Sequence, residues 1–170
     1  MVARGSVAAP EAVVERFLSD LSNHVWLAPG SVQMLSLSRR QDGEAEALVR
    51  LRGPLGVSRT ALTELFPSVD PESIRGTAQI GTRTKASIAW TVRGRGEASD
   101  VTLCATVDAA GPVDALLLRL GGRRWLSRKF AAALERLAGE VAPVALDAPE
   151  VAPSGRRTAT AVAAAAGRPA

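Results

Sequence analysis

The sequence predicts an α+β fold of one domain, in which an antiparallel sheet is followed by a long C-terminal helix. Six consecutive segments in the middle of the chain alternate apolar and polar residues, as strands with one covered face do. A short segment near the N-terminus and a long one after the last strand repeat apolar residues at helical spacing instead. With 170 residues, 46% of them hydrophobic, the chain is long enough for one domain with a substantial core.

The N-terminal part is predicted to form a strand and then a helix. Residues 2–8 are expected to be the first strand. Pro10 suits the first turn of a helix, where its missing N–H costs little. Apolar residues then recur at helical spacing, which predicts an amphipathic helix over 10–21. Residues 22–24 interrupt this helix, and 25–27 continue as a short apolar turn.

The six strand-like segments are separated by stretches rich in Gly, Pro and Asp, and this pattern is typical of an antiparallel meander. The predicted strands span 31–39, 44–52, 57–66, 73–80, 83–93 and 100–108. Two of the predicted breaks are Gln-Asp-Gly at 41–43 and Gly-Pro-Leu-Gly at 53–56.

The longest periodic segment begins at Gly111 and is predicted to be one helix that ends near Val141. It contains the pair Gly121-Gly122, and each glycine costs about 1 kcal/mol relative to alanine inside a helix. The pair therefore either kinks the helix or allows a strand or ligand to approach closely. We assign residues 1–142 to the folded domain and 143–170, which are rich in Ala and Pro, to a flexible tail.

Charge and cysteine content limit the classes of function. The net charge is +4, and the stretch from Arg119 to Lys129 contains five cations and no acid, so the rest of the chain carries −1. The favoured interpretation is composition bias together with a solvated helix face. An anionic membrane surface is less favoured, and nucleic acid is less favoured still. A single cysteine, Cys104, excludes an intramolecular disulfide, and no long apolar segment or signal sequence is evident, so we expect a cytoplasmic protein.

The order of elements resembles that of the START-like (SRPBCC) superfamily, which includes polyketide cyclases and dehydrases. The resemblance covers about residues 2–141. It rests on that order and on four local features, which are VAAPEAV at 7–13, LSDLSNHVWL at 18–27, IAW at 88–90 followed by VTL at 101–103, and ALERL at 133–137. It implies a helix-grip fold, in which two short helices follow the first strand and a curved antiparallel sheet wraps around a long C-terminal helix. None of these features is a catalytic signature.

The resemblance also implies a cavity between the sheet and the long helix. The residues expected to line it are Val49, Leu51, Ala78, Ile88, Trp90 and Leu103 from the strands, with Leu116, Leu120 and Phe130 from the helix. The alternative is that these residues simply fill a core. The small residues Gly76, Ala78, Ala86 and Ala105 favour a cavity, since bulkier side chains there would close it.

Three polar or aromatic residues are candidates for contact with a ligand. His24, the only histidine, has a side chain suited to a general base, although a capping or surface role is favoured. Trp26 is interpreted as a lid or core anchor, with a stacking platform as the alternative. Arg59 would pair with an anionic ligand head if its strand face is concave, and would face water if the register is shifted by one residue. One histidine and one cysteine far apart predict no metal site, and no cofactor motif is present.

Three functions are consistent with these observations. The favoured one is binding of a hydrophobic small molecule, such as a lipid, an isoprenoid or a polyketide-like compound. The second is an aromatase/cyclase-like or dehydratase-like enzyme that acts on a polyketide-type substrate with help from His24 or Arg59. The third is an interaction protein that uses the basic segment on an anionic partner.

Overall fold

The computed structural model describes residues 1–39, 44–53, 56–66 and 73–146. These residues form a seven-stranded antiparallel sheet with the strand order β1-β7-β6-β5-β4-β3-β2. The strands are β1 (Val2–Val7), β2 (Val32–Arg39), β3 (Ala45–Arg52), β4 (Ser58–Phe66), β5 (Ser73–Ile80), β6 (Thr84–Arg95) and β7 (Ala98–Ala109). The helical elements are α1 (Glu11–Ser19), η1 (Leu21–Asn23), α2 (His24–Leu27), α3 (Pro112–Leu117), η3 (Leu118–Gly122) and α4 (Arg123–Leu146).

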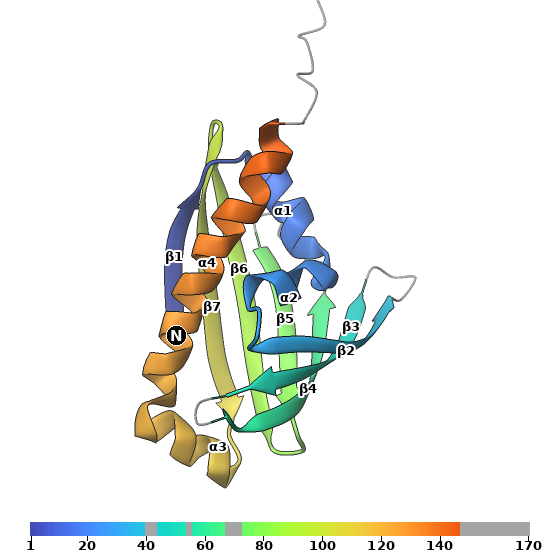
Figure 1. Ribbon diagram of the computed structural model, residues 1–170, viewed down its shortest axis with the longest axis vertical. Coiled ribbons are helices and arrows are strands. Elements are labelled where there is room, and N and C mark those ends of the chain that lie inside the picture. The colour runs from blue at the N-terminus through green and yellow to red at the C-terminus, as the bar shows by residue number, and fades with distance from the viewer. Residues whose placement is uncertain (40–43, 54–55, 67–72, 147–170) are drawn as a thin grey trace, which may run out of the picture.

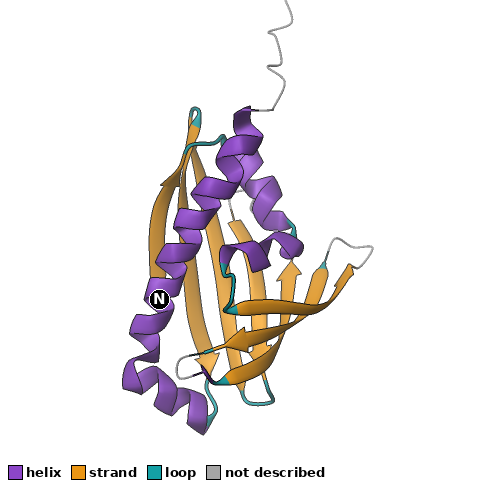
Figure 2. Cartoon of the chain, in the orientation of Figure 1, coloured by secondary structure: helices purple, strands orange, loops and turns teal. Residues whose placement is uncertain are grey.

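The predicted helix-grip fold is confirmed. Figure 1 shows α4 running along the sheet, and Figure 2 shows the sheet curving around the side on which the helices lie. Each predicted strand agrees with an observed strand to within two residues at either end. The largest differences are at the turn between β6 and β7, where β6 ends two residues later than predicted, at Arg95, and β7 begins two residues earlier, at Ala98. The turn is this tight because Gly96 takes the positive φ of 71° that it requires.

The filled part of the core lies between α1, β1, β7 and the C-terminal half of α4. Leu137 and Val141 of α4 are fully buried there, as are Val14 and Leu18 of α1. The helix approaches β1 closely, since a Cβ added at Gly5 would lie 3.4 Å from the Cβ of Leu134. Apolar burial of this kind stabilises the fold by roughly 25 cal/mol per Å².

The C-terminal helical segment differs from the single helix predicted over 111–141. It is broken into α3, the wider turn η3 and α4, because Gly121 has a φ of 108° that interrupts helical geometry. A Cβ at Gly122 would lie only 2.6 Å from the carbonyl oxygen of Leu117, so this position too requires glycine. Of the two predicted roles for this glycine pair, the structure therefore shows the kink.

The helix α4 continues to Leu146, so the predicted boundary at residue 142 falls inside it. The rest of the predicted tail and the predicted turn at 41–43 lie outside the described residues, as does the middle of the predicted break at 53–56. Within the described ranges no helix combines the length and the apolar character required to cross a membrane.

Candidate ligand-binding cavity

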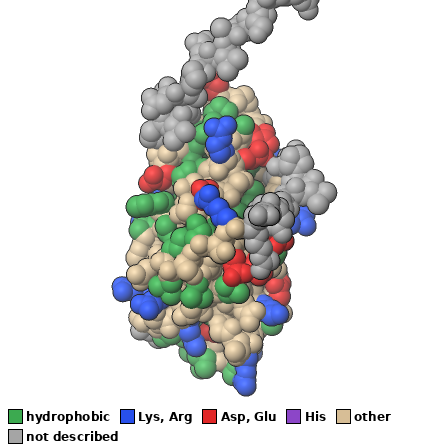
Figure 3. All heavy atoms as spheres, turned by 90° about the vertical axis from the view of Figure 1, so that its right-hand side faces the viewer, with side chains coloured by type: hydrophobic (Ala, Val, Ile, Leu, Met, Phe, Trp, Pro, Cys, Tyr) green, Lys and Arg blue, Asp and Glu red, His purple; other side chains and the backbone are tan. Residues whose placement is uncertain are grey.

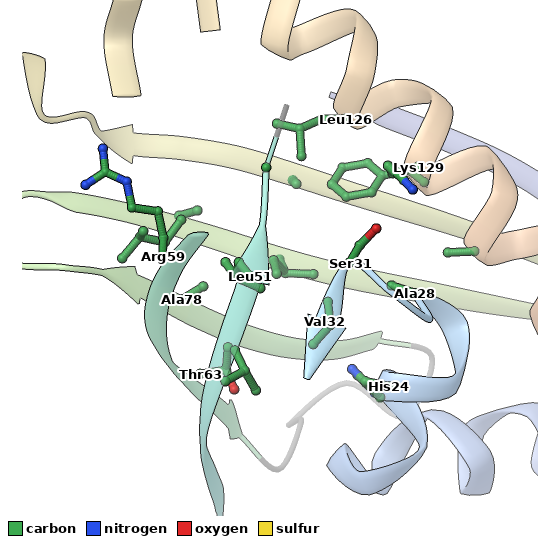
Figure 4. A pocket seen from close by; sticks show the side chains of 18 of the residues that line it. His24, Ala28, Ser31, Val32, Leu51, Arg59, Thr63, Ala78, Leu126 and Lys129 are labelled. Atoms are coloured by element: carbon green, nitrogen blue, oxygen red, sulfur yellow. The ribbon is translucent and has the colours of Figure 1, made fainter. Parts of the chain in front are cut away.

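A cavity of about 390 Å³ lies between the concave face of the sheet and the segment formed by α3, η3 and the first turns of α4. Figure 4 shows its wall, with side chains that converge from the strands, from α2 and from α4. The volume lies within the range of small-molecule sites. Nine of the twelve residues predicted to line the cavity or contact a ligand are in its wall, and they are His24, Val49, Leu51, Arg59, Ala78, Ile88, Trp90, Leu103 and Phe130.

Small residues on adjacent strands leave the space open. Ala78 of β5 pairs with Ala86 of β6, and Ala105 of β7 pairs with Ile88, two residues further along β6, so the three alanines lie close together on three adjacent strands. The three alanines line the cavity, as does Gly76. Gly76 has an additional reason to be small, since a Cβ there would lie 2.6 Å from the backbone oxygen of Glu64 in β4.

Two of the predicted lining residues, Leu116 and Leu120, do not line the cavity and are a correction to the sequence-based set. Trp26, predicted as a lid or core anchor, is not part of the core. Trp26, Leu116 and Leu120 have exposed fractions of 63%, 56% and 75%. In the single helical turn of α2, Leu27 takes the buried position and Trp26 points outward. The break at Gly121 interrupts the continuous apolar stripe on which the sequence predicts Leu116 and Leu120.

On the helical side of the wall, four apolar residues that were not predicted take their place, and they are Leu117, Leu118, Trp125 and Leu126. Strands contribute further unpredicted lining residues, among them Met34, Leu65 and Ile80. The four helical residues lie on both sides of the glycine pair. The glycine pair is the sequence feature that could have identified these four residues. If the segments before and after Gly121-Gly122 are treated as separate helices, each has its own apolar face.

His24 stands in the cavity wall and also holds the end of α1. Its Nε2 lies 2.7 Å from the carbonyl oxygen of Leu18, one of the last carbonyls of α1 that have no partner within the helix. This is the contact that the capping interpretation predicts. Its ring packs edge-on against Trp90, with ring centroids 6.1 Å apart and planes at 72°.

Burial lowers the pKa of His24 below its usual value of 6.5, and this effect outweighs the hydrogen bond to Leu18 and the charge of Asp20, which both raise it. The ring is therefore neutral at pH 7. Because a carbonyl can only accept, Nε2–H is the donor to Leu18 and Nδ1 is the unprotonated nitrogen.

Arg59 lies on the concave face of β4, so the register that would have turned it to water is not the observed one. Its Nη2 lies 3.7 Å from Oδ1 of Asp114 in α3, and the Arg59 side chain is 40% exposed. Its Nε is buried and has no hydrogen-bond partner in the described part of the chain. An unsatisfied buried donor costs about 1–3 kcal/mol.

The basic segment from Arg119 to Lys129 is split between solvent and the cavity. Arg119, Arg123, Arg124 and Arg128 are exposed, whereas Lys129 is half-buried in the cavity wall with its Nζ 5.6 Å from the centroid of the Trp125 ring. On the face shown in Figure 3, cationic and acidic side chains are interspersed. The interpretation as a solvated helix face therefore fits four of the five cations.

The remaining chemistry-bearing groups lie apart from one another. No cluster of three His, Cys, Asp or Glu side chains suited to a metal ion occurs among the residues that the structure describes. Cys104 is half-buried and is not part of the cavity wall, since it alternates with Leu103, which is. The cavity is thus an apolar site with a few polar groups in its wall.

Comparison with known proteins relates the sequence to one family. The model of the family described as polyketide cyclase/dehydrase and lipid transport matches residues 2–142. No curated protein sequence matches the chain.

Several solved structures share the fold at low sequence identity. A protein of Thermus thermophilus is 20% identical, with a TM-score of 0.69, over 85% of this chain and 97% of the other. A START superfamily protein of Mycobacterium smegmatis is 17% identical, with a TM-score of 0.62, over 85% and 97%. An aromatase/cyclase from Streptomyces sp. R1128 is 18% identical, with a TM-score of 0.59, over 84% and 92%.

Proposed function

Because this chain belongs to the START-like family of polyketide cyclases/dehydrases and lipid transport proteins, we propose that it binds a hydrophobic small molecule in the cavity between the sheet and the C-terminal helices. The expected ligand classes are lipids, isoprenoids and polyketide-like compounds. The proposal rests on one observation, the cavity of about 390 Å³ whose wall is mostly aliphatic and aromatic.

The physical basis of binding would be burial of the ligand's apolar surface. Removing apolar surface from water is worth roughly 25 cal/mol per Å², from which the cost of immobilising the ligand must be subtracted. Polar groups in the wall, such as His24, Arg59 and Thr63, would orient the ligand. This division of roles is typical of small-molecule sites.

The test is native mass spectrometry of the purified full-length chain for co-purifying small molecules, with a thermal-shift panel of lipids, isoprenoids and aromatic polyketides. We expect at least one apolar compound to be retained or to raise the melting temperature. If none is retained and none stabilises the chain, the proposal is wrong.

A matched pair of variants tests whether such a ligand occupies the cavity. Ala86→Phe places a large ring in the cavity, whereas Ala89→Phe places the same ring on the same strand at a position outside the cavity wall. We expect Ala86→Phe to abolish retention and Ala89→Phe to preserve it. Equal retention by both variants would place the ligand elsewhere on the molecule.

A second candidate function is catalysis on a polyketide-type substrate, and the position of His24 is the observation that favours it. The ring lies in the cavity wall, is neutral at pH 7 and has an unprotonated Nδ1 that is able to accept a proton. His24→Gln keeps a side-chain N–H that can reach the Leu18 carbonyl but removes the base. Turnover of an aromatic polyketide precursor that is lost in this variant, with binding retained, would support an enzyme, and unchanged turnover would exclude His24 as its base.

A further inference from the structure

Arg59 is a polar group of the cavity wall whose hydrogen-bonding capacity is largely unused. Its Nη2 meets Asp114 at 3.7 Å, which is longer than the 2.7–3.2 Å typical of a hydrogen bond. Its Nε is buried and has no partner among the described residues. The side chain as a whole is 40% exposed, so other N–H donors of the guanidinium are available at a cavity whose wall is otherwise mostly apolar.

The acidic groups of the same wall already have partners. Asp114 accepts a hydrogen bond from the Thr84 hydroxyl, with 2.6 Å between the oxygens, and Thr84 is held in turn by the backbone N–H of Gly111 at 3.0 Å. Glu64 accepts a hydrogen bond from the Thr77 hydroxyl at 3.1 Å. The carboxylates are therefore positioned by the fold, whereas the guanidinium retains unused donors.

Two further cations of the wall, Arg52 and Lys129, add to the positive potential of the cavity, so that its three cationic side chains outnumber the acids Glu64 and Asp114. Lys129 lines it from α4 and packs over Trp125, and no ion pair to Lys129 occurs within the described ranges. Figure 4 shows Arg59 and Lys129 on different elements of the wall, one on β4 and the other on α4. A cavity with low-dielectric walls concentrates this potential, which favours an anion over a neutral polar group.

We propose that the ligand of this cavity is an amphipathic carboxylate, and that Arg59 binds its carboxylate while the apolar walls enclose its body. This inference rests on the proposed function. A carboxylate matches the planar fork of a guanidinium and forms two parallel hydrogen bonds with it. A doubly charged phosphate is disfavoured because Asp114 lies beside Arg59 and would repel it more strongly.

The experiment first establishes occupancy of the cavity with the neutral apolar fluorescent probe N-phenyl-1-naphthylamine and then measures its displacement from the full-length chain by laurate, methyl laurate and lauryl phosphate. We expect laurate to displace the probe at a concentration roughly tenfold to a hundredfold lower than methyl laurate does, as hydrogen bonds to charged groups imply. Arg59→Met should remove this difference while the probe still binds.

Two controls separate Arg59 from other cations. Arg50→Met removes an exposed arginine of β3 that does not line the cavity, and it should leave the preference for laurate unchanged. Lys129→Met should weaken the preference by a smaller factor than Arg59→Met does. A preference that survives Arg59→Met and disappears in Lys129→Met would overturn the assignment to Arg59.

The remaining outcomes distinguish this inference from the proposed function. Equal displacement by laurate and methyl laurate would overturn the inference and leave apolar binding intact. Stronger displacement by lauryl phosphate than by laurate would overturn the carboxylate class. If neither the probe nor any of the three compounds binds, the proposed function itself fails, and this inference fails with it.

Discussion

The two halves of the contact between the sheet and the C-terminal helices are packed differently. The C-terminal half of α4 fills its side of the contact, with Leu134, Leu137 and Val141 no more than 5% exposed. The N-terminal half, together with α3 and η3, lies over the cavity, and residues such as Leu117 and Leu126 are only half-buried. One sheet thus supports a filled core at one end and a binding site at the other.

The difference comes from side-chain size and from the break in the helix. Opposite the first turns of α4 the sheet presents alanines such as Ala78 and Ala86, and the kink at Gly121 sets α3 at an angle to α4, as Figure 1 shows. At the other end the helix lies close to β1 at Gly5. A close backbone approach produces the filled half, and small side chains beneath a kinked helix produce the hollow half.

The largest expected effect tests this comparison directly. Leu137→Ala, in the filled half, should lower the free energy of unfolding by about 2–5 kcal/mol, because deleting a fully buried leucine leaves a void that the surroundings do not fill. Leu126→Ala, in the hollow half, should cost clearly less, because that side chain already borders open space. Urea unfolding of both variants measures the two costs, and equal costs would contradict a difference in packing.

The features that could be predicted from the sequence are those that depend on residues close together in the chain. Alternation within a strand is local, so the strand limits and the concave position of Val49, Leu51 and Ile88 could be predicted from the sequence. Whether the space between sheet and helix is filled depends on residues from distant strands that meet only in the fold. Alternation along one strand therefore does not predict whether that space is filled or open.

The errors concern the places where helical phase is lost. The sequence predicts Leu116 and Leu120 on the apolar stripe of one helix over 111–141, but the phase of that stripe does not carry across Gly121. Trp26 lies in a helix of a single turn, which is too short for periodicity to identify its buried face. The hydrogen bond of His24 to Leu18 has a sequence signal, a polar residue shortly after a helix end, but its position in the cavity wall depends on contact with Trp90 of β6.

The next effect in size concerns the kink that separates the two halves. Gly121→Ala should destabilise the protein by roughly 1–3 kcal/mol, since a φ of 108° is strained for any residue with a Cβ. Gly139→Ala is the matched control within α4. A Cβ there meets no atom within 4 Å, so this variant should instead stabilise the protein by up to about 1 kcal/mol. Thermal unfolding of the two variants measures whether each substitution lowers or raises the stability. Stabilisation by both substitutions would mean that the kink is not needed.

The smallest effect concerns His24, which stands where the two halves meet, with Leu18 of the filled core on one side and the cavity on the other. Folding lowers the pKa of His24 from 6.5, so in the pH range just below 6.5 the unfolded chain binds more protons than the folded chain. The contribution of His24 to stability is therefore complete above pH 6.5 and decreases as the pH falls toward its lower folded-state pKa. Asp20, whose pKa is lowered mainly by the hydrogen bond from the Ser22 side chain, loses its contribution only at more acidic pH, below its usual 3.8.

Urea unfolding in steps from about pH 7.5 to about pH 5 separates these two windows, since unperturbed carboxyl groups titrate near pH 4. The wild-type chain should lose stability over this range, and His24→Gln, which cannot titrate there, should lose less. An apolar ligand that fills the cavity should steepen the wild-type slope, because excluding water from the ring further disfavours its charged form. Identical slopes for the wild type and His24→Gln would mean that water reaches the ring freely, and the boundary between the filled and hollow halves would then lie on the core side of His24.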